Sequence, residues 1–298
     1  MTYQFEKLRK AIALSTPHYV RKMMPPKITR HLYFSGKFKA RLNGKVLFTM
    51  VANSGKYENE IYWHGIEGGL EKRSQQIWAE YCKVFQPKNI LDVGANSGLY
   101  SLIAIAQAPN STVTSIEPIP EAIRRMAENM SVNSFQHNIF GGALSNYTGE
   151  GNIYLESDKN YASSVTLNTF SDLAISGVHD LNKEFNELTV PVSTLSNLIQ
   201  EEFCKIPDLV KIDVETHELQ VIEGFGYDLA LSKAFLIEVL NDEIARGLNI
   251  FFANKGFIYF NINDEKNSLR LTDSIQKSDF WNYFICAPEV AKKLSSLS

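Results

Sequence analysis

Short apolar runs separated by longer amphipathic segments dominate the chain from about residue 69 onward. The runs have the length and composition of buried strands, near residues 89–93, 112–116, 137–142, 208–214 and 234–239. The segments between them carry helical spacing, so that strands and helices alternate. This alternation predicts an α/β fold built on a doubly wound, mostly parallel sheet over residues 69–298.

Residues 1–68 follow a different pattern, and we expect them to form an accessory region. Residues 1–30 look helical until Pro25 and Pro26, which should stop any helix. The predicted domain therefore carries an N-terminal extension that begins with helix.

A β-hairpin is predicted next in this extension. The alternating segments 38–42 and 46–51 flank Asn43 and Gly44, a strong two-residue turn signal. An aromatic, glycine-broken stretch then leads into a helix expected over about residues 70–84.

Residues 150–191 interrupt the rhythm of strands and helices. The stretches GNIYLES and YASSVTL suggest short strands, and the polar segment SDLAISGVHDLNKEFNE follows them. Insertions of this kind often cover substrate. We therefore expect residues 150–191 to be a substrate cover.

The richest local signal is NILDVGANSGLY, residues 89–100, where a strand opens through a small-residue turn into a helix with free backbone N–H groups. A dinucleotide fingerprint needs G-x-G-x-x-G, but Asn96 and Leu99 occupy its second and third glycine positions. Asp92 would repel a pyrophosphate, yet it can accept hydrogen bonds from a ligand ammonium group. The turn therefore favours S-adenosylmethionine over NAD.

The next predicted strand ends at Glu117 and Pro118, where a carboxylate can accept hydrogen bonds from both hydroxyls of a ribose. The alternative is an ordinary strand–helix–strand unit with a solvated glutamate. The residues expected to bind the cofactor from these two strand ends are Asp92, Gly94, Ala95, Asn96, Gly98, Glu117 and Pro118.

Six ordered blocks between about residues 67 and 289 resemble the FkbM family of S-adenosylmethionine-dependent methyltransferases. They are LDVGANSGLYSLIA, IEPIPEAIRRMAENMSVN, GGALSN, DLVKIDVETHELQVIEGF, FLIEV and NYFICAP. The resemblance implies a seven-stranded class I (Rossmann-like) methyltransferase sheet whose last strand is antiparallel. It also implies O-methylation of a hydroxyl on a sugar, a glycolipid or polysaccharide precursor, or a small natural product. By the same resemblance Ala143 and Leu144 contact adenine, the alternative being a simple strand end and turn.

The block DLVKIDVETHE places two charges, Lys211 and Asp213, in a strand that should be buried. One interpretation is an ion pair of Lys211 with Asp213 or Glu215 that ties the strand to the following loop. The family resemblance instead implies that Asp213 and Glu215 lie beside the methionine part of the cofactor and the acceptor hydroxyl, with Lys211 on the substrate side.

The same block departs from the family pattern Glu-Gly-Ala-Glu, because this chain has Glu215, Thr216, His217 and Glu218 there. An acceptor alcohol must lose a proton, and His217 titrates near neutral pH. We hypothesise that His217 is the base; Asp213 or Glu215 would serve if burial raised its pKa. The alternative is a helix-start histidine that faces solvent or caps the helix.

Four further residues are candidates for substrate contact. Trp63, His64 and Glu67 in IYWHGIEGG have the chemistry to stack on a sugar ring and bind its hydroxyls, although aromatic residues before a core strand are more often packing residues. Glu238 is an acid inside the apolar run FLIEV, so it is either paired or functional. No metal is expected, since ligands on the single loop after residue 212 need not converge.

Charge is distributed unevenly around the net value of −3. Residues 1–56 carry 12 Lys or Arg against the single acid Glu6, a net charge of +11, and the remainder carries 18 Lys or Arg against 32 Asp or Glu, or −14. The basic arm is suited to an anionic surface, and Phe5, Leu8 and Ile12 have the spacing of a helix lying on a membrane. The alternative is that this helix packs on the acidic part of its own chain or of a partner subunit in a homo-oligomer.

Two other functions stay open from the sequence. A nucleic-acid methyltransferase would need the basic arm and the site to form one continuous basic stripe, against which the acidic domain argues. A non-catalytic lipid- or glycan-binding protein would need no cofactor, against which the intact residues of the turn argue.

Cellular location follows from three sequence features. No apolar run approaches the roughly 20 residues that span a bilayer, and charges interrupt the N-terminus where a signal peptide would be apolar. Cys82, Cys204 and Cys286 are few and far apart, as suits packing residues in a reducing compartment. We expect a cytoplasmic protein, with peripheral attachment to the inner face of the membrane as one option.

Overall fold

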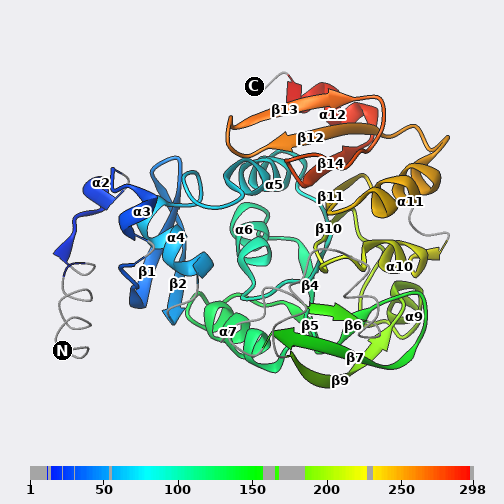
Figure 1. Cartoon of the computed structure of the whole chain (residues 1–298), viewed down its shortest axis with the longest axis horizontal. Coiled ribbons are helices and arrows are strands. Elements are labelled where there is room, and N and C mark those ends of the chain that lie inside the picture. The colour runs from blue at the N-terminus through cyan, green and yellow to red at the C-terminus, as the bar shows by residue number, and fades with distance from the viewer. Residues whose placement is uncertain are drawn as a thin grey trace.

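The computed structural model describes residues 12, 15–21, 23–29, 31–53, 56–156, 165–167, 185–226 and 231–295 (Figure 1). Its centre is an eight-stranded sheet. In order across the sheet the strands are β13 (Ser268–Thr272), β12 (Ile258–Asn263), β14 (Asn282–Cys286), β11 (Ala234–Glu238), β10 (Leu209–Ile212), β3 (Asn89–Val93), β4 (Thr112–Ile116) and β5 (Asn138–Phe140).

The predicted doubly wound sheet is confirmed. Strands β3, β4, β5, β10 and β11 are parallel, and β14 runs antiparallel between β11 and β12. The sheet has one strand more than the seven expected, because β13 pairs with β12 and extends the edge. After β5 the chain returns to the other side of β3, so the order of strands reverses between β3 and β10. Open α/β sheets bind ligands at the carboxyl ends of strands at such a point.

Helices cover both faces of the sheet. One face carries α5 (Lys72–Phe85), α6 (Leu99–Gln107), α7 (Pro120–Ser131) and α12 (Pro288–Ser295), and the other carries α9 (Leu195–Gln200), α10 (Glu218–Glu223) and α11 (Asp242–Phe252). Side chains of β11 alternate between two cores: Leu236 joins the first cluster, and Phe235 and Ile237 join the second. Because both faces are buried, central strands such as β3 and β11 are mostly apolar, and this is why they were recognisable in the sequence.

The accessory region contains the predicted hairpin. Strands β1 (Ser35–Leu42) and β2 (Lys45–Asn53) pair antiparallel around Asn43 and Gly44, whose φ angles of 50° and 75° are those of a hairpin turn. Helices α2 (His18–Arg21), α3 (Pro26–Thr29) and α4 (Lys56–His64) accompany it.

Helix α2 ends at Arg21, before Pro25 and Pro26, which were expected to stop any helix. A new helix, α3, begins at Pro26. Proline fits the first turn of a helix, where its missing N–H has no intrahelical acceptor.

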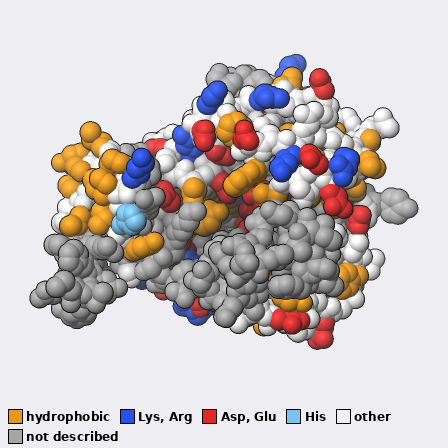
Figure 2. Space-filling model, viewed as in Figure 1, with side chains coloured by type: hydrophobic (Ala, Val, Ile, Leu, Met, Phe, Trp, Pro, Cys, Tyr) orange, Lys and Arg blue, Asp and Glu red, His pale blue; other side chains and the backbone are white. Residues whose placement is uncertain are grey.

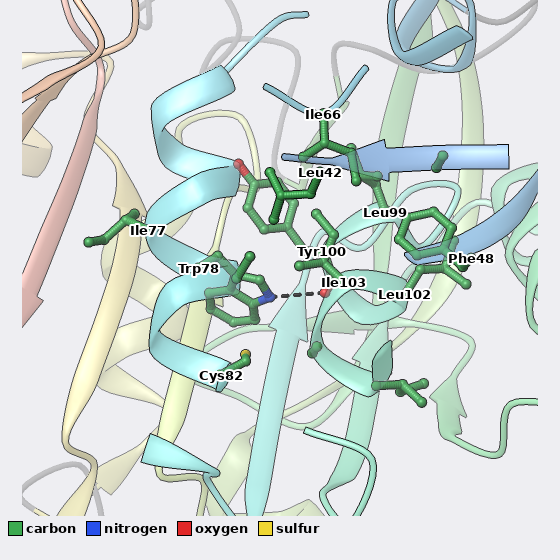
Figure 3. Close-up of a cluster of buried hydrophobic side chains, with 14 of the residues drawn as sticks. Leu42, Phe48, Ile66, Ile77, Trp78, Cys82, Leu99, Tyr100, Leu102 and Ile103 are labelled. Atoms are coloured by element: carbon green, nitrogen blue, oxygen red, sulfur yellow. Dashed lines mark hydrogen bonds between the residues drawn. The ribbon is translucent and has the colours of Figure 1, made fainter. Parts of the chain in front are cut away.

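The hairpin and the sheet share one apolar core, seen in Figure 3, where Leu42 and Phe48 meet the helices that cover β3. Trp78 of α5 crosses this core and donates its indole N–H to the carbonyl of Tyr100 at 2.9 Å. Arg125 of α7 also forms an ion pair with Glu58 of α4, and both side chains are almost fully buried. The described part of the accessory region is therefore built into the core.

Helix α7 and the residues just after it also form hydrogen bonds with the edge of the hairpin. The N–H groups of Thr49 and Val51 in β2 donate to the side-chain oxygens of Asn133 and Asn129 at 2.7 and 2.8 Å. The amide of Asn129 in turn donates to the carbonyl of Ser97 at 3.0 Å. One asparagine thus connects the hairpin to the turn that follows β3.

The insertion forms part of a second sheet. Its four strands, in order, are β6 (Ala143–Leu144), β9 (Phe185–Ser193), β7 (Gly149–Glu156) and β8 (Val165–Leu167). The short strands expected from GNIYLES and YASSVTL are therefore present. Most of the polar segment predicted to cover substrate lies outside the described residues, and its last residues belong to β9.

Replacing Phe48 by Ala tests the shared core. Phe48 is 3% exposed among side chains of both regions, so the variant should lose about 3–5 kcal/mol of unfolding free energy. Val46 lies in the same strand and is 44% exposed, so Val46→Ala should change the free energy of unfolding by less than about 0.5 kcal/mol. Urea unfolding followed by tryptophan fluorescence measures both. Equal stability of the two variants would contradict a common core.

Candidate active site

A cavity of about 1020 Å³, including its open mouth, lies at the carboxyl ends of β3, β4 and β10. Its walls come from the turn after β3, the residues after β4, the loop after β10, strand β6, and Tyr57 and Glu71 from the segment before the sheet. Ile153 of β7 also lines the cavity, so the described part of the insertion reaches it. The cavity lies where the reversal of strand order predicts a ligand site.

The turn at 94–98 is fixed by the chain around it. Gly94 has φ +75°, and a Cβ atom there would lie 1.8 Å from the carbonyl oxygen of Asp213. Gly98 has φ +84°, and a Cβ atom there would lie 2.7 Å from Cγ of Met126. The N–H groups of Gly94 and Ala95 both donate to the carbonyl of Ile116, at 3.0 and 3.1 Å. These glycines are therefore required by the protein's own packing before any ligand is considered.

Glu117 holds this turn from the end of β4. Its Oε2 accepts a hydrogen bond from the N–H of Asn96 at 2.7 Å, and its Oε1 accepts from the N–H of Ile119 at 3.0 Å. Burial raises the pKa of Glu117 to about 7, although both N–H donors act in the opposite direction. Each carboxylate oxygen has a second lone pair. Because Glu117 lines the cavity, it is able to receive ribose hydroxyls as the sequence predicted.

Asp92 lies behind the wall of the cavity and does not line it. Its Oδ2 accepts a hydrogen bond from the hydroxyl of Ser101 at 2.7 Å, and that hydroxyl also lies 2.7 Å from the hydroxyl of Ser115. Burial raises the pKa of Asp92. The structure therefore gives Asp92 a supporting position, in contrast to the direct ligand contact expected from the sequence.

Lys211 and Asp213 form the ion pair that the sequence left open. Nζ of Lys211 lies 3.0 Å from Oδ2 of Asp213 and 3.5 Å from the carbonyl oxygen of Gly94. Burial opposes the charge of Lys211, but the carboxylates of Asp213, Asp92 and Glu71 hold its pKa above the ordinary value. Both side chains line the cavity, so the pair is also part of the site.

Glu71 is a site residue that the sequence analysis missed. It precedes α5 with a left-handed φ of 51°, and its Oε2 accepts a hydrogen bond from the hydroxyl of Tyr100 at 2.8 Å. Burial, followed by the charge of Asp213, raises the pKa of Glu71 to about 7. Tyr57 was missed as well. An acid placed directly before a helix, after two glycines, was the available signal for Glu71.

The loop after β10 holds three predicted residues at the cavity, Asp213, Glu215 and His217. Glu215 and Thr216 both have left-handed φ angles, 54° and 82°, which cost energy in residues with a side chain. Glu218 stabilises this conformation, because its Oε1 accepts hydrogen bonds from the N–H groups of Val214 and Thr216 at 3.1 and 3.3 Å.

His217 occupies the N-cap position of α10, but its side chain is neither exposed nor used to cap the helix. It is 3% exposed, it makes no side-chain capping hydrogen bond to α10, and its Nε2 lies 3.0 Å from the hydroxyl oxygen of Ser145. Ser145 follows Ala143 and Leu144, which line the cavity as predicted for an adenine wall. His217 therefore lies at the side of the cavity formed by β6.

Three residues predicted to contact substrate are not brought to the cavity. Trp63 is fully buried and donates its indole N–H to the carbonyl of Leu32 at 2.8 Å. Nε2 of His64 lies 3.0 Å from the hydroxyl of Thr29, and Glu67 accepts a hydrogen bond from the backbone N–H of Asn43. Their aromatic and polar groups bond within the accessory region, so these three side chains form no sugar platform at this cavity.

Glu238, at the end of β11, lies beside the cavity and does not line it. Burial raises its pKa well above the ordinary value, and the nearby carboxylates of Asp213 and Glu215 raise it further. Its Oε2 is buried and has no hydrogen-bond partner among the described residues. Within the described part of the chain, no group of three or more His, Cys, Asp or Glu side chains is arranged to hold a metal ion.

The strand order and the cavity at its reversal define the class of protein, a class I methyltransferase fold. The methyl donor of this class is S-adenosylmethionine. The model of the methyltransferase FkbM domain matches residues 92–268. The chain belongs to the FkbM family of methyltransferases, as its ordered sequence blocks predicted.

Several curated proteins are similar to parts of this chain. "Methyltransferase 1" of Beauveria bassiana is 29% identical over 153 residues, covering 45% of this chain and 57% of that protein. "Hexuronic acid methyltransferase AglP" of Haloferax volcanii is 26% identical over 148 residues, covering 50% and 54%. The chain thus spans little more than half the length of either relative.

Solved structures resemble the fold at low identity. Cofactor-bound Rv0187 from MTB has a TM-score of 0.42 at 9% identity, covering 74% of this chain and 81% of that one. A putative caffeoyl-CoA O-methyltransferase from Staphylococcus aureus has a TM-score of 0.41 at 12% identity, covering 72% and 83%. These scores are low, and the fold assignment rests on the strand order of this chain.

Substitution of Gly94 tests the packing of the turn, with Gly44 as a matched control. Both have φ +75°, but a Cβ atom at Gly44 would meet no atom within 4 Å. Gly44→Ala should therefore cost about 1 kcal/mol of unfolding free energy from backbone strain alone. Gly94→Ala should cost about 1–3 kcal/mol more, because the turn must move away from Asp213. Similar urea midpoints for the two variants would contradict this account.

The pKa of Glu117 predicts pH-dependent cofactor binding. In the folded protein the carboxyl group of Glu117 stays protonated up to about pH 7, whereas its ordinary pKa is 4.5. The contribution of Glu117 to folding stability therefore falls as the pH rises from 4.5 to about 7. Ribose hydroxyls favour the ionised carboxylate, so the affinity for S-adenosylmethionine should weaken as pH falls below about 7 and level off above it. Calorimetry in buffers of different ionisation enthalpy should record release of a proton from Glu117 when S-adenosylmethionine binds.

Glu71→Gln provides the control, since the pKa of Glu71 is also about 7. This variant should keep the pH dependence of cofactor binding, and Glu117→Gln should lose it. If Glu71→Gln lost the pH dependence and Glu117→Gln kept it, the proton released on cofactor binding would come from Glu71.

Proposed function

We propose that this chain transfers the methyl group of S-adenosylmethionine to a hydroxyl of a sugar, of a glycolipid or polysaccharide precursor, or of a small natural product. The observation that carries the proposal is the group of acidic side chains, Glu71, Asp213 and Glu215, that lines one cavity with the cofactor residues. Carboxylates accept hydrogen bonds from hydroxyl groups. The printed name of the Haloferax volcanii relative, a hexuronic acid methyltransferase, supports a carbohydrate acceptor.

The residues of the turn and of β4 fit the cofactor. Glu117 supplies acceptors for a ribose, and Pro118, Ala143 and Leu144 supply an apolar wall for a purine. The carboxylate of Asp213, which lines the cavity next to Gly94, is suited to a ligand ammonium group. When bound there, S-adenosylmethionine supplies a methyl group activated by a positively charged sulfur.

The chain must then align the acceptor oxygen and remove its proton. We propose Glu71 as the base. Its pKa of about 7 suits proton transfer near neutral pH, and the hydroxyl of Tyr100 holds its Oε2 at 2.8 Å. Asp213 is engaged by Lys211 at 3.0 Å, which favours a positioning role. His217, the base hypothesised from the sequence, has its Nε2 3.0 Å from Ser145, on the side that fits adenine.

Nucleic acid is a weaker candidate acceptor. Acidic side chains at the cavity repel a phosphate backbone, and Lys211 is already paired with Asp213. A non-catalytic lipid- or glycan-binding role would leave the cofactor residues without a use.

The acceptor is tested by incubating the full chain with methyl-labelled S-adenosylmethionine and a panel of compounds. The panel contains a hexuronic-acid oligosaccharide, a neutral oligosaccharide, a glycolipid extract, a small-metabolite extract, an amine and RNA. The expected product is a labelled carbohydrate whose methyl group survives mild alkali, as an ether does and a carboxyl ester does not. Label in RNA, in the amine or in an alkali-labile ester would overturn the proposal. No transfer despite measurable cofactor binding would favour the non-catalytic role.

Glu71→Gln should lower kcat by about 10²–10⁴-fold and leave the affinity for S-adenosylmethionine within a few-fold, because the amide cannot accept the proton. It should also remove the limb of the kcat–pH profile near pH 7. His217→Gln is the matched variant, in which an amide keeps a partner for Ser145. If His217→Gln abolished activity while Glu71→Gln retained it, His217 would be the base.

A further inference from the structure

The N-terminal end of the molecule carries an exposed apolar surface, which we call the N-terminal patch. Figure 2 shows hydrophobic side chains gathered at this end, over the region of α2 and α3. Eleven large hydrophobic side chains are exposed in the described part of the chain, and five of them lie within residues 12–33. The residues of the patch are Ile12, Tyr19, Met23, Ile28 and Tyr33.

The patch is the outer side of a segment whose inner side is packed. Thr29, Leu32 and Phe34 are at most 9% exposed, whereas Tyr19 and Met23 are 73% and 81% exposed. The segment is thus already docked on the protein through one set of side chains. The second, outward-facing set has no function in the core.

The part of the sequence that carries the patch is rich in positive charge. Residues 12–53 contain eight Lys or Arg and no Asp or Glu. Of these, Lys27 and Lys37 are exposed, and Lys27 directly precedes Ile28 of the patch. A matching partner surface therefore carries negative charge and has an apolar interior that side chains can enter.

An anionic phospholipid surface offers both, since basic residues bind its headgroups while apolar side chains enter the acyl boundary. Nucleic acid offers phosphate but no apolar interior. A second copy of this chain offers acidic surface, but its exposed hydrophobic side chains outside the patch are scattered, as Ile250 in α11, Leu271 in β13 and Trp281 before β14 illustrate.

We propose that the N-terminal patch docks this protein on an anionic phospholipid membrane. The protein would lie on the surface, since no helix in the part of the chain that the structure describes is long and apolar enough to cross a bilayer. Helices α2 and α3 pack on α4, whose residue Tyr57 lines the cavity. The docking surface and the acceptor side of the cavity are therefore connected through one helix.

Vesicle flotation with the full chain tests this proposal. Binding is expected to phosphatidylcholine vesicles containing phosphatidylglycerol, weakly or not at all to phosphatidylcholine alone, and less as salt is raised. The triple variant Tyr19→Ser/Met23→Ser/Ile28→Ser should bind at least about tenfold more weakly. Its control, Ile250→Ser/Leu271→Ser/Trp281→Ser, removes equally exposed hydrophobic side chains elsewhere and should bind like the wild type.

Charge reversal gives a second, independent pair of variants. Lys27→Glu/Lys37→Glu should weaken vesicle binding by about tenfold or more, and Lys277→Glu/Lys292→Glu, also at exposed lysines, should not. Unchanged affinity for S-adenosylmethionine shows that each variant is folded. No binding by the wild type, or equal binding to neutral vesicles, overturns the proposal. A wild-type dimer that the triple serine variant converts to monomer, without vesicle binding, would assign the patch to a second copy.

Discussion

The close approach of two backbone segments at the carboxyl edge of the sheet determines the site. Gly94, which has no Cβ atom, lies against the carbonyl of Asp213, and this contact joins the turn after β3 to the loop after β10. The N–H groups of Gly94 and Ala95 attach the same turn to Ile116 at the end of β4. Three strand ends are thereby held around one cavity. The residues that would hold the cofactor and those that would act on the acceptor follow from this packing.

The accessory region is tied to the same turn. Asn129 accepts a hydrogen bond from Val51 of the hairpin and donates one to the carbonyl of Ser97. Tyr57 of α4 lines the cavity, and α2 and α3 pack on the same helix. A membrane bound by the N-terminal patch would therefore lie next to a helix that contributes to the acceptor side. Such a position would suit a glycolipid acceptor, and it would give the charge asymmetry of the sequence a function.

The parts predicted from the sequence are those specified by local pattern. Buried strands such as β3 and β4, and the turn at Asn43 and Gly44, carry their signal in adjacent residues. Residues whose environment is made by distant segments were not predictable. Trp63 has the sequence context of a sugar platform, but its indole N–H donates to the carbonyl of Leu32, 31 residues away. Glu71 was missed because Tyr100, which lies 29 residues away, holds its carboxylate at the cavity.

In the proposed complex, the turn at 94–98 and Glu117 hold S-adenosylmethionine, and the acids Glu71 and Asp213 lie on the acceptor side. A crystal structure of the complex with S-adenosylhomocysteine tests it most directly. The account predicts the ribose hydroxyls on Glu117, adenine against Leu144, and the sulfur directed toward Glu71. A ligand whose ribose lies away from Glu117, or whose sulfur faces His217 with Glu71 remote from it, would contradict the account.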